Sequence, residues 1–406
     1  MRTVALFSVL LMLGMIGSQF LPLMPEPIHA QAGLIIQLLT MIGLAFIMIH
    51  VGYEFELDKA NLRQYGWDAV VAATAASLPW LFASLYLVFA MLPSDTWGGL
   101  RAWQEGVLVG LFAAPTSAGL LFAMLAAAGL SGTWLFRKAR VLAIFDDLDT
   151  VLLLIPLKIL LVGWSVGLAA SVILMLLLLW LAYQFLHRWA IPVTWRWVLS
   201  YAVLTALVCE AAYLGSQWLL QEPVHVEVLL PAFVLGCLMR WPTGANPHGD
   251  DQREGHQEGP EHPVEQRVAT IVSAAFMILV GLSMPPMFGQ HQAPAAFEIQ
   301  DPAATLSGGL PFPGWGPIAV HVLVLTVLIN FGKMFPLLCY RREVRVKERL
   351  ALSIGLWPRG EVGAGVLLLS LSYGIGGPLV TVGVLCLALN LVLTGVFIGA
   401  VKKLLA

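Results

Sequence analysis

Apolar segments of about twenty residues recur along the whole of this 406-residue chain. As an α-helix, such a segment is long enough to cross the hydrocarbon core of a bilayer. Hydrophobic residues make up 59% of the chain and charged residues only 11%, whereas about 25% of residues are charged in soluble domains. The sequence therefore predicts an all-α polytopic membrane protein, and we expect no nucleic-acid partner.

We predict about twelve transmembrane helices. Their approximate limits are residues 4–24, 34–53, 67–92, 106–130, 141–162, 165–185, 198–219, 224–239, 268–287, 318–338, 350–373 and 378–401. The segment 241–266 between the eighth and ninth spans is polar and acidic. Its histidines would suit pH sensing or metal binding, but we favour a solvated linker.

Lysine and arginine residues are concentrated on one side of the predicted membrane. With the N-terminus in the cytoplasm, nearly all of those outside the spans lie on the cytoplasmic side, and Arg101 is the exception. Cytoplasmic loops carry this excess of positive charge, so we expect an inner-membrane protein with both termini cytoplasmic. Arg2, the first apolar run and the sequence Ala30-Gln31-Ala32 imitate a cleavable signal. We favour an uncleaved first span because the apolar run reaches Met24.

Two of the spans contain helix breakers at similar depths. The fourth contains Ala-Pro-Thr-Ser-Ala-Gly at 114–119, and the eleventh contains Gly-Leu-Trp-Pro-Arg-Gly-Glu at 355–361. Pro115 alone would suit an ordinary kink. However, the two breaks are seven spans apart, so the triplets of spans around them have opposite orientations. This layout predicts inverted repeats with two broken, crossing helices at the membrane midplane, where broken backbone is tolerated if it is buried or lines a cavity.

Three charged residues lie inside predicted spans near these breaks. Asp146 and Asp147 are adjacent in span 141–162, and Lys333 lies in span 318–338. A charge near the bilayer centre costs at least about 2.5–3.5 kcal/mol, so such residues by default mark ion paths or proton relays. Neighbouring helical residues differ by about 100° in direction, so one aspartate can face Lys333 while the other faces a cavity. A static buried ion pair is the alternative, but it leaves the second aspartate unexplained.

Together these motifs resemble a known family. Phe145-Asp146-Asp147-Leu148, the pair Thr116-Ser117, Lys333 and the run from Pro358 to Gly363 are similar to bacterial sodium/proton antiporters of the monovalent cation:proton antiporter superfamily, on its Kef/Nap-like branch. The resemblance implies an ion-transport core of residues 67–162 and 317–406. It assigns residues 1–66 and 163–290 to a scaffold that forms a homodimer.

The resemblance also implies roles for individual residues. Asp147 would be the principal carrier of the cation and the proton, and Asp146 would pair with Lys333 in electrogenic exchange. Thr116 and Ser117 would add oxygen atoms to the monovalent-cation site, although packing hydroxyls fit equally well. Arg359 and Glu361 would have a gating or structural role. The transported ions are sodium and protons, and no cofactor is expected.

Three other functions remain alternatives at this stage. A potassium/proton antiporter needs only a few shifted ligands. An intramembrane aspartyl protease also needs two aspartates, but its pair usually comes from two facing helices. A passive channel would not need a carboxylate–lysine pair. We therefore expect a secondary transporter and not an enzyme.

Overall fold

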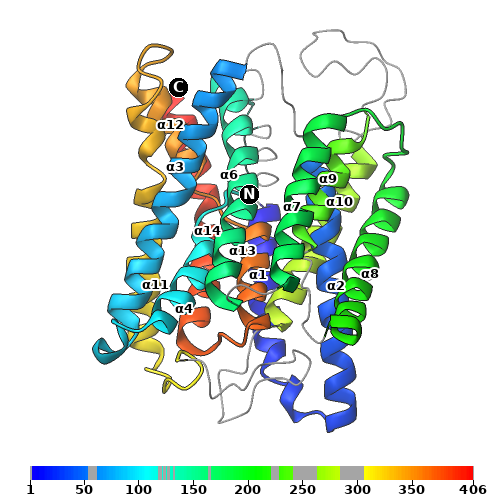
Figure 1. The fold of residues 1–406 in the computed structure, drawn as a ribbon. Helices are drawn as coiled ribbons and strands as arrows, with labels where there is room; N and C mark the ends of the chain where they lie inside the picture. Colours follow the sequence, from blue (N-terminus) through cyan, green and yellow to red (C-terminus); the bar gives the residue numbers. More distant parts are fainter. Residues whose placement is uncertain are drawn as a thin grey trace. The chain divides into compact units, whose positions relative to one another are not determined.

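A computed structural model describes residues 2–53, 62–117, 121, 125, 129–130, 133–162, 166–220, 228–240, 263–283 and 306–405. These residues form thirteen α-helices and no strand (Figure 1). Each of the twelve predicted spans contains helical residues, which confirms the prediction of an all-α polytopic fold.

The helices are grouped into two compact units. The first comprises Met1–Gln37, Leu57–Leu161 and Met277–Ala406, and the second comprises Leu38–Glu56 and Val162–Phe276. The helices of the first unit are α1 (Arg2–Ser18), α3 (Leu62–Tyr86), α4 (Leu100–Gly110), α6 (Trp134–Val162), α11 (Trp315–Gly332), α12 (Val346–Gly355), α13 (Glu361–Ser372) and α14 (Gly377–Leu405). Those lying mainly in the second are α2 (Glu26–Tyr53), α7 (Val166–Phe185), α8 (Trp195–Leu220), α9 (Leu229–Leu238) and α10 (Pro263–Leu282).

The unit boundaries differ from the expected grouping mainly at three places in the described part, residues 2–37, 62–66 and 277–283, which lie in the first unit although the resemblance assigned them to the scaffold. Helix α1 belongs to the first unit, in which it packs against α14, whereas the sequence grouped residues 1–66 with the scaffold. The transport and dimerisation roles of these parts of the chain stay predictions.

Several described segments are suited to a bilayer. By length and composition, four helical segments could cross a membrane, namely Gln31–His50, Gly66–Met91, Trp315–Leu338 and Gly377–Leu405. Shorter apolar helices lie at Val9–Ser18, Leu176–Phe185, Arg267–Leu282 and Val362–Leu371.

Both predicted helix breaks are present. Helix α4 ends at Gly110 and continues as the 3₁₀ turn Leu111–Ala113, after which residues 115–117 are not helical. Helix α12 ends at Gly355, and α13 begins at Glu361. Proline cannot donate the hydrogen bond that would continue a helix, which is why Pro115 and Pro358 each lie in a gap.

A third interruption falls in the tenth span, which the sequence predicts as one continuous helix. Helix α11 ends at Gly332, Lys333 is its C-cap, and the chain continues as the 3₁₀ turn Phe335–Leu338. Pro336 in this turn cannot take part in an α-helical ladder. Lys333 therefore lies at the end of a helix, not inside one.

Within the first unit, α1 and the last residues of α10, from Met277 onward, cross closely at a pair of glycines. A Cβ atom added to Gly14 would lie 2.3 Å from the carbonyl oxygen of Ile278, and one added to Gly281 would lie 2.4 Å from that of Leu11. No side chain fits at either position, so the two backbones approach in a way that only glycine allows.

Helices α2 and α9 make a matching crossing in the second unit. A Cβ atom on Gly52 would lie 2.0 Å from the oxygen of Phe233, and one on Gly236 would lie 2.1 Å from that of Ile49. With the seven-span offset of the predicted inverted repeats, the first span corresponds to the eighth and the second to the ninth. The crossing of α1 with α10 therefore corresponds to the crossing of α9 with α2, as such repeats require.

Candidate functional site

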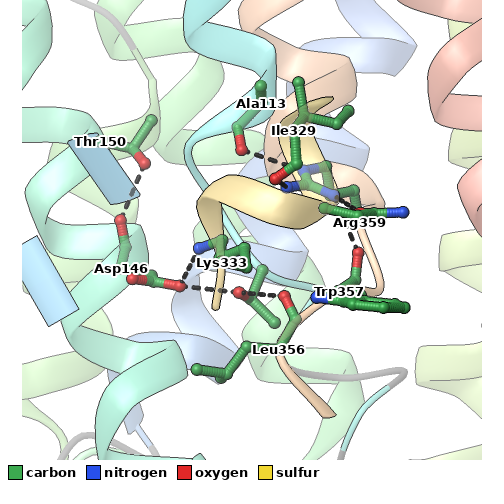
Figure 2. A network of polar contacts seen from close by, with 10 residues as sticks. Ala113, Asp146, Thr150, Ile329, Lys333, Leu356, Trp357 and Arg359 are labelled. Carbon is green, nitrogen blue, oxygen red and sulfur yellow. Dashed lines mark hydrogen bonds and ion pairs between the residues drawn. The ribbon is translucent and has the colours of Figure 1, made fainter. Parts of the chain in front are cut away.

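The two aspartates lie in the interior of helix α6 and are almost completely buried. Asp146 is 0% exposed and Asp147 is 1% exposed. The ammonium group of Lys333, also 0% exposed, forms an ion pair with Oδ2 of Asp146. Figure 2 shows Lys333 reaching Asp146 from the end of α11. The structure thus brings together the lysine and the first aspartate of the motif, which are 187 positions apart in the sequence.

The first helix break places Thr116 at this ion pair. Its hydroxyl group lies 2.7 Å from Oδ2 of Asp146 and 3.1 Å from the carbonyl oxygen of Leu356. A hydroxyl has one proton to donate, so these two acceptors compete for it. Oδ1 of Asp146 has no hydrogen-bond partner among the described residues.

The two breaks also contact each other through their backbones. The N–H group of Ser117 donates to the carbonyl oxygen of Pro358 over 2.9 Å. Buried backbone groups require partners, and here an amide of the first break pairs with a carbonyl of the second. Thr116 and Ser117 are both buried, so these sequence-predicted residues lie where the two breaks meet.

Arg359 holds the ends of the interrupted helices together. Its guanidinium group donates to the carbonyl oxygens of Ala113 at 3.0 Å, Trp357 at 3.0 Å and Ile329 at 2.9 Å (Figure 2). These carbonyls lie at or near the C-terminal ends of α4 with its 3₁₀ turn, α12 and α11. Helix C-termini carry partial negative charge, so one buried cation stabilises three of them.

Asn330 completes this network and is a residue that the sequence analysis missed. Its side-chain oxygen accepts a hydrogen bond of 2.6 Å from Arg359, and it lies three positions before Lys333. The sequence could have indicated Asn330, because it is an isolated amide in an apolar segment and lies close to a lysine in the same segment. The side chain of Glu361, which was grouped with Arg359 in a gating or structural role, lies outside the described part. The four oxygens to which Arg359 donates within the described part are all neutral.

A second buried polar cluster, formed by Asp68, Lys138 and Tyr340, lies in the same unit. The sequence did not indicate it. Lys138 donates to both carboxylate oxygens of Asp68 at 3.0 Å. Tyr340 donates its hydroxyl proton to Oδ1 of Asp68 over 2.7 Å. Burial, the carboxylate of Asp68 and the neighbouring Glu343 raise the pKa of Tyr340, because each of them disfavours the phenolate. Lys138 is buried, although it lies in the sequence between two other basic residues, Arg137 and Arg140.

Three other charged residues of the predicted spans make no described contact with this cluster. Asp149 is half-buried, and its Oδ2 has no hydrogen-bond partner among the described residues. Glu210 is half-buried in α8, and the side chain of Lys158 lies outside the described part.

The site is thus a buried cluster of two carboxylates, one ammonium group and one hydroxyl group beside two helix breaks. Carboxylate and hydroxyl oxygens are ligands that hard cations prefer, and a carboxylate also binds a proton. The arrangement has the chemistry to exchange one for the other without any covalent step.

Comparisons with known proteins agree with this geometry. The chain matches the family model described as "sodium/hydrogen exchanger, transmembrane" over residues 2–404. It is similar in structure to the sodium proton antiporter MjNhaP1 from Methanocaldococcus jannaschii, with a TM-score of 0.59 and 13% identity over 98% of this chain and 91% of that chain. No curated protein matches it significantly. At 13% identity the structural likeness concerns the fold, but the family match covers nearly the whole sequence. The chain therefore belongs to the family of transmembrane sodium/hydrogen exchangers.

Proposed function

We propose that this protein exchanges sodium ions for protons across the membrane by alternating access. The observation that carries the proposal is the buried cluster of Asp146, Asp147, Lys333 and Thr116 at the meeting point of two broken helices. Membership of the sodium/hydrogen exchanger family supports the same function and favours it over potassium/proton exchange.

Competition for one carboxylate provides the exchange mechanism. In this proposal Asp147 binds either a sodium ion or a proton, and both seek the same oxygens. If the core crosses its barrier only when this site is occupied, loading one ion requires release of the other. No net transport then occurs without exchange.

We further propose that the exchange is electrogenic. Lys333 and Asp146 form a buried ion pair, and isolated charges in such a place are costly. A sodium ion that takes over Asp146 leaves the ammonium without a counter-ion, which favours release of its proton. One proton from Asp147 and one from Lys333 would then move for each sodium ion.

An intramembrane aspartyl protease fits the geometry poorly. Such an enzyme needs two carboxylates that face each other across a substrate, whereas Asp146 and Asp147 are successive residues of one helix and Asp146 is paired with Lys333.

The cellular setting is also a proposal. We infer a multi-pass protein of the inner membrane with both termini in the cytoplasm, from the distribution of lysine and arginine. A homodimer held by the scaffold helices in a lipid environment is the expected assembly.

Proton flux in proteoliposomes tests the proposed function. An outward gradient of sodium, potassium or lithium is imposed in turn, and the internal pH is followed with an enclosed dye. We expect proton uptake to be driven by sodium and not by potassium. Flux driven by potassium alone would assign the potassium/proton alternative, and a cation flux that proceeds without proton movement would indicate a channel.

A further inference from the structure

Tyr340 has an unusual backbone conformation. Its φ angle is +52°, and only one other non-glycine residue in the described part, His187, also has a positive φ. Non-glycine residues persist in this region when their surroundings hold them there. For Tyr340 these surroundings are the hydrogen bond to Asp68, Lys138 at 4.7 Å from the centre of the ring, and an edge contact with Trp134 at 5.8 Å.

Two of the partners of Tyr340 belong to the helix that carries the cation site, and the third, Asp68, belongs to α3. Lys138 and Trp134 are residues of α6, the helix that carries Asp146. Tyr340 itself ends the short segment that begins with Lys333 at the end of α11. The same two parts of the chain are therefore joined twice, once by the ion pair of Lys333 with Asp146 and once by the contacts of the Tyr340 ring with Lys138 and Trp134.

The segment between these two junctions has little stiffness of its own. It contains a 3₁₀ turn, Phe335–Leu338, and such turns have poorer hydrogen-bond geometry than an α-helix. Contacts at its two ends therefore determine its position. At the first end Gly332 lies against Pro79 of α3, where an added Cβ would be 2.7 Å from the backbone nitrogen. Near the other end Arg349 donates to the oxygen of Leu337 over 2.7 Å.

The hydroxyl group of Tyr340 is not needed to neutralise Asp68. Lys138 already donates to both oxygens of that carboxylate. What the hydroxyl adds is a connection between the end of the Lys333 segment and the ion pair of α3 with α6.

We propose that Tyr340 is a positioning residue for the cation site. Through Asp68 and Lys138 it holds the segment from Lys333 to Tyr340 against α6, and this keeps the ammonium group on Asp146. The inference rests on the proposed function, because it concerns how strongly Lys333 competes with sodium for that carboxylate.

The proposal predicts a specific change in sodium affinity. If the hydroxyl of Tyr340 is removed, the segment loosens and the ammonium competes less strongly for Asp146. Sodium should then bind at a lower concentration. A residue that only stabilises the fold would lower the unfolding temperature without tightening sodium binding.

The experiment compares Tyr340→Phe with the wild type as purified full-length protein. The unfolding temperature is measured in a sodium titration, with choline to hold ionic strength constant, and the half-saturating sodium concentration is extracted. We expect Tyr340→Phe to lower it at least about threefold, because the lost hydrogen bond has a charged acceptor. Tyr86→Phe is the matched control. Its hydroxyl group bonds to His321 over 2.9 Å between α3 and α11, and its removal should leave the half-saturating concentration unchanged.

The Lys333→Gln background shows whether Tyr340 acts through the lysine. In that background Tyr340→Phe should not change the half-saturating sodium concentration further. An equal effect in both backgrounds, or no effect of Tyr340→Phe in the wild type, would overturn the proposal. If Tyr340→Phe does not fold, Asp68→Ala, which removes the acceptor of the Tyr340 hydroxyl, should also lower the half-saturating concentration, and an unchanged value would count against the proposal. A wild-type protein that neither responds to sodium nor moves protons would instead refute the proposed function.

Discussion

Thr116 donates a hydrogen bond to Asp146 on the carboxylate oxygen that also receives Lys333. The threonine comes from the first helix break, and its second acceptor, the carbonyl of Leu356, comes from the second break. One hydroxyl group therefore connects both breaks to the aspartate of the ion pair. A charge change at Asp146 would alter how this hydroxyl group is shared.

Replacing Thr116 with valine keeps its shape and removes the hydroxyl. We expect Thr116→Val to reduce the free energy of unfolding by about 1.5–3 kcal/mol, the usual contribution of a hydrogen bond to a charged group. Thr116→Ser should recover most of the loss. Thermal unfolding of the purified proteins measures both, and a valine variant as stable as the wild type would show that the hydroxyl group does not stabilise the fold.

Asp147→Asn tests the principal carrier. The amide cannot alternate between a bound proton and a bound cation, so we expect a folded protein without sodium-driven proton flux and without proton-driven sodium flux. Proteoliposome assays in both directions measure this, with size-exclusion chromatography as the control for folding. Substantial flux through a well-folded variant would remove Asp147 from the mechanism.

Asp146 and Lys333 can be separated by a double-mutant cycle. Either Asp146→Asn or Lys333→Gln leaves one buried charge without its partner, which typically costs about 3–5 kcal/mol. The double variant has no orphan charge and should recover part of that loss. Additive losses in the free energy of unfolding would mean that the two residues do not interact energetically.

Electrogenic exchange predicts a response to membrane potential. A potential of about 100 mV contributes roughly 2.3 kcal/mol for each net charge moved per cycle. A potassium diffusion potential set with valinomycin should therefore change the rate of sodium-driven proton flux, and reversing its sign should reverse the effect. Flux that ignores the potential would indicate one-for-one exchange and a purely structural Lys333.

Arg359→Lys tests the network at the helix ends. Lysine keeps the charge but lacks the planar fork of donors, so it cannot reach all the acceptors in Ala113, Ile329, Trp357 and Asn330. Each buried group left without a partner costs about 1–3 kcal/mol, and we expect a total loss of at least about 2 kcal/mol in unfolding free energy. Arg342→Lys, at an exposed position, is the control. Equal stability of the two variants would show that charge alone is sufficient at position 359.

The sequence was a good guide to the helices because each is long and apolar, and this pattern does not depend on tertiary contacts. It was a poorer guide to where they stop. The end of α11 at Gly332 was missed because the apolar character continues through Lys333 to Leu338. Pro336 could have indicated this end. However, it lies only two residues before residue 338, the predicted end of the span, so it was compatible with a helix that continued almost to that end.

The charged residues of the site were found because charges stand out in an apolar span, as Asp146 and Lys333 do. Lys138 was not identified because it lies between Arg137 and Arg140, and nothing local distinguishes a buried lysine from exposed neighbours. Its partner Asp68 is 70 positions away in the sequence. Partners so distant cannot be paired from composition and periodicity alone.

The two glycine crossings make the two halves of the chain depend on each other. Helix α1 closes on α10 and α2 closes on α9, so each crossing joins a helix from the first half to one from the second. A half-length fragment would have no partner for either of its glycine surfaces. Each half of the chain therefore depends on the other to cover its glycine surfaces.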